Sequence, residues 1–192
     1  MSKPIWTALF GGTFNPLHNG HLTIARSVLE QGLADEVWIL ITPCNPWKKD
    51  HELLDDRLRY EMAVQAVKDM DNVKASDYEF SLPKPSYTAN TLRRISADYP
   101  DREFILTIGA DNWVKFNEWK ESDFILSNYR IIVYPRNGYE TTPTPDGVTL
   151  LECPLVDLSS TDIRKRVANG EPINEMVPAA VARTIADLKL YL

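Results

Sequence analysis

Two histidines and a pair of glycines stand close together near the start of the chain, in a segment that could bind an anion. Residues 11–21 read Gly-Gly-Thr-Phe-Asn-Pro-Leu-His-Asn-Gly-His, so His18 and His21 are three positions apart at the start of an expected helix. That spacing lets both side chains point to one side. The apolar run before them predicts a strand, and a strand, glycine turn and helix together present backbone N–H groups to an anion. The segment therefore predicts a phosphate-handling site in an enzyme that uses a nucleotide.

Other interpretations of this segment fit the sequence less well. A P-loop requires Gly-Lys-Ser/Thr, and the sequence contains no Gly-Lys pair. The dinucleotide fingerprint G-x-G-x-x-G also does not fit, because Gly11 and Gly12 are adjacent and the next glycine is Gly20. The two histidines could instead hold a metal with His51, but residues 11–21 contain no carboxylate ligand. Phosphate binding is favoured, and no metal ligand is assigned to the protein.

Composition limits the classes of protein to which the chain can belong. We expect its 192 residues to form a single domain, 1–192, long enough for a real core. A net charge of −6 argues against a large nucleic-acid surface, although local donors can still bind a small anion. Cys44 and Cys153 are interpreted as reduced thiols. The sequence has no apolar run of about 18 residues and no signal peptide, so we expect a cytoplasmic protein that does not enter membranes. A homo-oligomer is left open.

The order of the expected elements predicts the fold class. Several strands are continuous apolar runs rather than alternating ones, which is typical of parallel strands buried on both faces. We therefore predict an α/β fold, a Rossmann-like doubly wound parallel sheet with a small helical C-terminal part. In such a sheet, ligands bind beyond the carboxyl ends of the strands, so Gly11 and Asp111 should border one crevice. The expected strands are residues 5–10, 37–41, 73–76, 103–108, 130–134 and 148–152, and the expected helices cover about 19–31, 55–68, the residues around 92–99, 160–170 and a final segment from about 178.

Two segments carry more specific structural expectations. Trp113 to Leu126 is rich in aromatic residues without a helical or strand period, and is expected to be irregular. The final helix should turn Val181, Ile185 and Leu188 inward, because these residues recur at helical spacing.

Four segments in order resemble the bacterial nicotinate (or nicotinamide) mononucleotide adenylyltransferases of the HxGH nucleotidyltransferase superfamily. The resemblance spans nearly the whole chain. It implies adenylyl transfer from ATP to nicotinate mononucleotide, giving nicotinate adenine dinucleotide and pyrophosphate in NAD biosynthesis, with Mg²⁺ as cofactor and only small-molecule nucleotides as partners. The four segments are residues 11–21, residues 85–88 with Thr91-Leu92, residues 108–111, and residues 159–164, which read Ser-Ser-Thr-Asp-Ile-Arg.

The residues suit this reaction without a general base. The second pKa of a phosphate monoester is about 6, so the attacking phosphate is already largely dianionic at neutral pH. The protein must then position two polyanions and stabilise charge. By the resemblance, His21 contacts the reacting phosphate, while His18 and the segment up to Arg164 hold the outer phosphates, and bound phosphate should favour the charged histidines. The predicted catalytic residues are His18, His21 and Arg164, and the predicted phosphate- or ATP-binding residues are Gly11, Gly12, Thr13, Phe14, Lys48, Gly109, Asp111, Ser159, Ser160 and Thr161.

Tyr87, Thr88 and Trp119 are assigned by the resemblance to the mononucleotide. Trp119 resembles the family tryptophan that stacks on the pyridine ring, although a lone tryptophan is more often a core residue. A carboxylate needs donors whereas an amide needs a donor and an acceptor, so loop amides and a threonine hydroxyl suit nicotinate. Lys120 stands where the family usually has tyrosine, and leaves this preference open.

Two further positions bear on the comparison with the family. Asn15 stands where the family usually has aspartate, and Asn-Pro is also a good turn pair. Arg136 matches only loosely the family segment beside adenine.

Three other functions are alternatives to this one. A sister adenylyltransferase could act on nicotinamide mononucleotide or phosphopantetheine, but an expected pocket for an aromatic ring argues against phosphopantetheine. A non-catalytic nucleotide-binding module would leave the two histidines and Arg164 unexplained. An NAD-dependent oxidoreductase lacks its fingerprint.

Overall fold

Six parallel strands form one sheet in the order β3-β2-β1-β4-β5-β6. The computed structural model describes residues 3–43, 53–139, 144–155 and 158–192. The predicted α/β parallel sheet is confirmed, and its strand order is that of a doubly wound fold. The strands are β1 (Ile5–Gly12), β2 (Glu36–Ile41), β3 (Val73–Ser76), β4 (Arg102–Gly109), β5 (Arg130–Tyr134) and β6 (Val148–Leu150).

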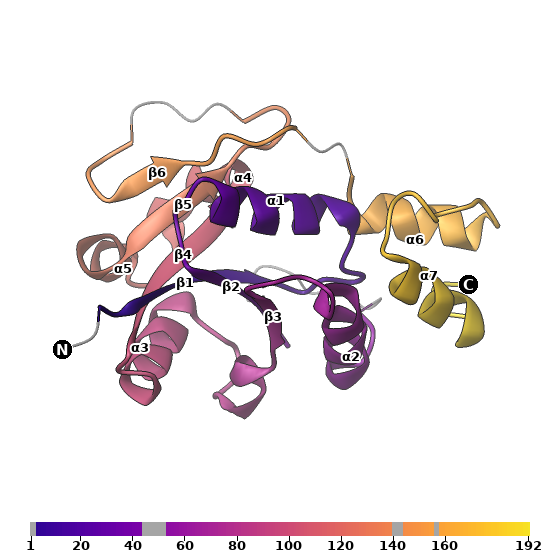
Figure 1. The fold of residues 1–192 in the computed structure, drawn as a ribbon, viewed down its shortest axis with the longest axis horizontal. Helices are drawn as coiled ribbons and strands as arrows, with labels where there is room; N and C mark the ends of the chain where they lie inside the picture. Colours follow the sequence, from indigo (N-terminus) through magenta and orange to yellow (C-terminus); the bar gives the residue numbers. More distant parts are fainter. Residues whose placement is uncertain (1–2, 44–52, 140–143, 156–157) are drawn as a thin grey trace.

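Helices cover both faces of this sheet, and Figure 1 shows α1 and α3 on opposite sides of it. Alternate residues of β1 explain the two layers. Ala8 and Phe10 pack into the core that includes α1 and α2, whereas Leu9 packs into the core that includes α3 and α5. The helices are α1 (Asn19–Glu30), α2 (Asp56–Val67), α3 (Thr88–Asp98), α4 (Ala110–Trp113), α5 (Ser122–Asn128), α6 (Ser160–Ala168) and α7 (Ala179–Asp187), with 3-10 turns η1 (Tyr78–Ser81) and η2 (Phe116–Glu118).

The strand order reverses between β1 and β4, which are adjacent in the sheet. From β1 the chain moves outward through β2 to β3, and from β4 it moves outward through β5 to β6. The loops that leave the carboxyl ends of β1 and β4 therefore separate. Gly12 pairs with Ile41, and Gly109 pairs with Tyr134, at the same edge of the sheet. A ligand crevice is expected at this edge.

The helices α6 and α7 lie together at one end of the molecule, beyond α2 and beside the C-terminus (Figure 1). Ile163, Val181 and Ile185 are buried there with Met62 of α2. The prediction that Leu188 also faces inward is wrong, since α7 ends at Asp187 and the Leu188 side chain is 55% exposed.

The segment 113–126 also differs from its prediction. It holds the end of α4, the turn η2 and most of α5 instead of irregular chain. These pieces are 4, 3 and 7 residues long, too short to show a helical period in the sequence. None of the helices in the described residues is long and apolar enough to cross a bilayer.

Candidate active site

The turn after β1 is shaped by the packing of Phe14 on Gly12. Phe14 has a positive φ of 45°, and a Cβ atom on Gly12 would lie 3.1 Å from its ring. The Phe14 ring also meets the His21 ring edge-on, with centroids 4.9 Å apart. Any larger residue at position 12 would displace Phe14. We call the turn from Gly12 to Phe14 the glycine loop. Because the Phe14 ring packs on both Gly12 and His21, this loop sets the position of His21.

His18 and His21 stack on each other at the start of α1, with ring centroids 3.6 Å apart. The backbone N–H of His18 donates to Nδ1 of His21 at 3.3 Å. Because Nδ1 accepts this hydrogen bond, neutral His21 carries its hydrogen on Nε2. His21 is thereby set up as an Nε2–H donor, which suits it to bind a phosphate oxygen.

His18 is a buried residue, with only 3% of its surface exposed. Burial, helped by the positive charge of Arg136, lowers the pKa of His18 from 6.5 to about 4. His18 is therefore neutral at pH 7. In the protein by itself, the cost of removing an imidazolium from water thus favours the neutral form of His18, whereas a charged His18 beside bound phosphate stays a prediction.

The α6 segment docks on the glycine-rich segment from a position far along the chain. Ser160 Oγ donates to the Pro16 carbonyl at 2.9 Å, and Arg164 Nη1 donates to the Asn15 carbonyl at 3.0 Å. Ser159 caps α6, its Oγ accepting from the Asp162 N–H at 3.1 Å. The fold thus brings together the two segments that the sequence assigns to phosphate, and two of their side chains hold the backbone on which His18 and His21 depend.

Asp111 lies in α4, directly after β4, where it faces Arg136; unlike Gly11, it is not among the described residues that line a cavity. Asp111 Oδ1 and Arg136 Nε are 3.7 Å apart, and the Arg136 guanidinium lies over the Tyr134 ring at 5.3 Å. A Cβ atom on Gly109 would lie 2.3 Å from Asp111 Oδ1 and 3.0 Å from the Tyr134 ring. A side chain at position 109 would therefore clash with Asp111 and Tyr134 where they now lie, and glycine avoids this clash.

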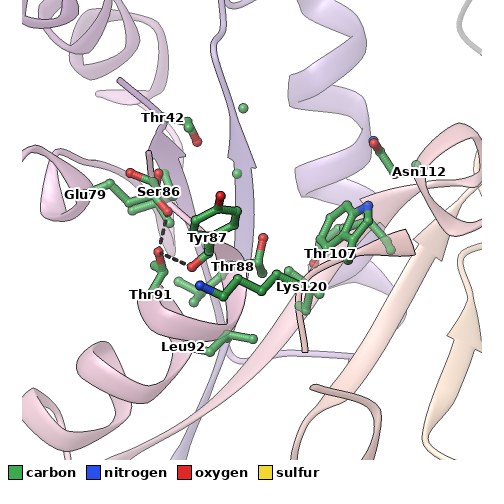
Figure 2. Close-up of a pocket in the computed structure, with 18 of the residues that line it drawn as sticks. Thr42, Glu79, Ser86, Tyr87, Thr88, Thr91, Leu92, Thr107, Asn112 and Lys120 are labelled. Carbon is green, nitrogen blue, oxygen red and sulfur yellow. Dashed lines mark hydrogen bonds between the residues drawn. The ribbon is translucent and has the colours of Figure 1, made fainter. Parts of the chain in front are cut away.

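A pocket of about 470 Å³ opens at the carboxyl ends of β1, β2 and β4 (Figure 2). The three residues assigned to the mononucleotide, Tyr87, Thr88 and Trp119, all line it. A volume of this size suits a small-molecule ligand. The other lining residues come from the strand ends, from η1 and α3, and from the segment after β4, and include Gly11, Gly12, Gly109, Thr42, Glu79, Ser86, Thr91, Asn112, Glu118, Lys120 and Tyr134.

The two histidines lie beside this pocket rather than in it. They line a separate small hollow of about 10 Å³ together with Arg136 and Cys153. Tyr134 borders both cavities. The candidate site therefore has two parts, a histidine part and a larger pocket, on either side of Tyr134.

Arg59 is a residue of the site that the sequence did not reveal. Its buried guanidinium donates to the Thr13 carbonyl in the glycine loop, to the Thr42 carbonyl after β2 at 3.3 Å, and to Asp56 at 2.6 Å. Asp56 stands three positions earlier on α2, a helix-face spacing that could have indicated an ion pair. The hydrogen bonds from Arg59 to the Thr13 and Thr42 carbonyls could not be predicted from the sequence, because these residues are far from Arg59 along the chain.

Glu79 is a second residue that the sequence did not reveal. Its Oε1 accepts from the Thr91 hydroxyl at 2.6 Å, and burial raises the pKa of its carboxyl. Asn15, for its part, has a structural partner: its Oδ1 accepts from the Tyr191 hydroxyl at 2.9 Å. Lys48, Cys44 and His51 lie outside the described residues.

Comparison with known proteins agrees with this fold. The profile of the cytidylyltransferase-like family matches residues 9–166. A Bacteroides fragilis protein named probable nicotinate-nucleotide adenylyltransferase is 42% identical, with 93% of this chain and 90% of the relative covered. A protein of the same name from Christiangramia forsetii is 38% identical, over 95% and 96%. The structure of Plasmodium falciparum nicotinic acid mononucleotide adenylyltransferase complexed with NaAD superposes with a TM-score of 0.81, at 18% identity and 97% coverage of both chains.

Proposed function

Because the chain belongs to the cytidylyltransferase-like family, together with relatives named as nicotinate-nucleotide adenylyltransferases, we propose that it transfers the adenylyl group of ATP to nicotinate mononucleotide. The products are nicotinate adenine dinucleotide and pyrophosphate. One observation carries the proposal: a pocket large enough for a ring and containing Trp119 lies next to a histidine pair at the carboxyl edge of the sheet. The α6 segment belongs to the same unit in this proposal, since Arg164 contacts the Asn15 carbonyl.

In this reaction the protein must position the two phosphate groups and stabilise negative charge, and it does not need to supply a general base. A phosphate oxygen of the mononucleotide attacks the α-phosphate of ATP, and pyrophosphate leaves. At neutral pH the nucleophile is already ionised, since its second pKa is about 6. His21 donates from Nε2 to the reacting phosphate, where negative charge is rearranged. Arg164 of α6 adds a guanidinium, a group that matches phosphate geometry.

The mononucleotide would occupy the larger pocket. Trp119 supplies a flat apolar surface for the pyridine ring, and base–aromatic stacking is worth roughly 1–3 kcal/mol. Thr88 adds a hydroxyl and is the first residue of α3. Gly11 and the glycine loop would then lie between the two substrates, where the backbone can approach phosphates closely because Gly11 and Gly12 have no side chain.

Mg²⁺ fits this site as a companion of ATP. Among the described residues, no group of three or more His, Cys, Asp or Glu could hold a metal ion. Mg²⁺ is commonly bound through substrate phosphates with few protein ligands. When bound, it supplies positive charge that neutralises the polyphosphate.

Pyrophosphate release tests the proposal directly. The protein is mixed with Mg-ATP and, in separate reactions, nicotinate mononucleotide, nicotinamide mononucleotide or phosphopantetheine at equal concentration. We expect the nicotinate form to react fastest. Preference for phosphopantetheine, or no release with any acceptor, would refute the function.

His21→Ala tests the assigned chemistry in the same assay. We expect a kcat at least about 100-fold lower, as is common when one charge-stabilising donor is lost, with an unchanged unfolding midpoint. Turnover equal to wild type would remove His21 from the mechanism.

A further inference from the structure

Lys120 is the only cation among the described residues that line the larger pocket. The other charged lining residues are Glu79 and Glu118. In Figure 2 the Lys120 side chain extends across the view past Thr88 toward Tyr87. Its Nζ atom lies 4.5 Å from the centroid of the Tyr87 ring. The ammonium thus contacts an aromatic face, and no ion pair joins it to Glu79 or Glu118 among the described residues; the carboxylate that its charge influences is that of Glu121.

A second source of positive potential faces the same wall. Helix α3 begins at Thr88, with Tyr87 at its N-cap, and both residues line the pocket. No side chain of the described residues caps this end, and its first turn contains no acidic residue. A helix N-terminus attracts anions, an effect that adds to that of a nearby ammonium. The wall formed by Tyr87, Thr88 and Lys120 is thus positive on two counts.

The carboxyl groups in the pocket do not cancel this potential equally. Burial raises the pKa of the Glu79 carboxyl, which favours its neutral form. Glu118 and Lys120 are both exposed, so water screens both charges until a ligand covers them. Trp119 and Lys120 both line this pocket, so a ring stacked on Trp119 would share the cavity with the Lys120 ammonium.

We propose that the Lys120 ammonium binds the carboxylate of the nicotinate ring and thereby selects the acid over the amide. The inference rests on the proposed function, since it assigns a determinant of specificity within that pocket. A carboxamide is neutral and gains little from an ammonium, whereas a carboxylate forms a charge-assisted hydrogen bond with it. Lys120 acts through its side chain, so a substitution leaves the local backbone donors in place.

The ratio of the two substrates measures this role. We compare kcat/KM for nicotinate and nicotinamide mononucleotides, by pyrophosphate release at saturating Mg-ATP, in wild type, Lys120→Met and Lys120→Arg. Lys120→Met should lower the acid-to-amide ratio about 10-fold, the size of one hydrogen bond to a charged group, mainly through a higher KM for the acid. Lys120→Arg should keep most of the ratio. Lys115→Met is the matched control, an exposed lysine of the same segment outside the pocket lining, and should change neither value.

The outcomes separate this inference from the function on which it rests. An equal loss for both substrates would place Lys120 on their shared phosphate, and an unchanged ratio would leave it a surface lysine; either result overturns the inference. A wild type that prefers the amide overturns it too, while adenylyl transfer stands. If wild type turns over neither substrate, the proposed function fails. The affinities of the two mononucleotides, measured by tryptophan fluorescence with the same variants, then still decide the role of Lys120.

Discussion

The buried His18 predicts a loss of stability in acid whose size follows from its pKa. Burial first, and then the charge of Arg136, lower this pKa from 6.5 to about 4 in the folded protein. Below pH 6.5 the His18 imidazole binds a proton in the unfolded chain, whereas in the folded protein it does so only near pH 4. Stability is therefore present above pH 6.5 and is lost as the pH falls toward 4. A difference of 2.5 pKa units at 1.36 kcal/mol each corresponds to about 3 kcal/mol.

His18→Gln provides the reference for this measurement, because it removes the titrating group. The free energy of unfolding is measured in urea at pH 4, 5, 6, 7 and 8 for both proteins, without nucleotide. Groups that titrate in both proteins, such as Glu79 with its raised pKa, largely cancel when the two curves are subtracted. The wild-type value should fall relative to the variant by about 3 kcal/mol between pH 7 and pH 4.

Parallel curves would refute the reasoning about His18. They would mean that the imidazole titrates equally in the folded and unfolded states, and hence that the stacked pair is open to water. An NMR titration of the His18 ring protons provides a separate test, with an expected midpoint near the pKa of about 4.

Two further variants test the contacts that hold the glycine loop. Arg59→Met should lower the free energy of unfolding by about 3–5 kcal/mol, because buried acceptors lose a charged donor. The control Arg57→Met removes an exposed arginine and should change the free energy of unfolding by at most about 1 kcal/mol. Urea unfolding measures both variants, and equally small effects would show that the buried guanidinium is dispensable. Tyr191→Phe removes the hydrogen bond to Asn15 and should lower stability by about 1 kcal/mol and kcat severalfold; an unchanged kcat in the pyrophosphate assay would limit Tyr191 to a structural role.

The sheet could be predicted from the sequence because its signal is local. Residues 130–134 form a strand with the expected bounds, and four of its five residues are a continuous apolar run. Parallel strands buried on both faces need continuous apolar residues, so each run is visible without knowledge of its neighbours. The cap of α6 was equally visible, since Ser159 bonds to the backbone only three residues away.

Contacts between distant segments were not visible in the same way. Arg59 lies in the predicted helix 55–68, and only the fold brings the Thr13 and Thr42 carbonyls to its guanidinium. The lowered pKa of His18 was missed for a related reason. A sequence indicates which groups could bind phosphate but not how much water the fold leaves around them.

The division of the site into two parts follows from the topology of the sheet. Because β1 and β4 are adjacent and their following segments diverge, the glycine loop and the start of α4 leave the sheet in different directions. The histidines then fall on one side and the ring pocket on the other, with Tyr134 bordering both. In the proposed reaction, the two nucleotides would meet with their phosphates beside Gly11 and Gly12, which line the larger pocket and have no side chains. If this arrangement is right, Lys120, which selects the acid, and His21, which contacts the reacting phosphate, should act independently. The factors by which Lys120→Met and His21→Ala lower kcat/KM for nicotinate mononucleotide should then multiply in the double variant.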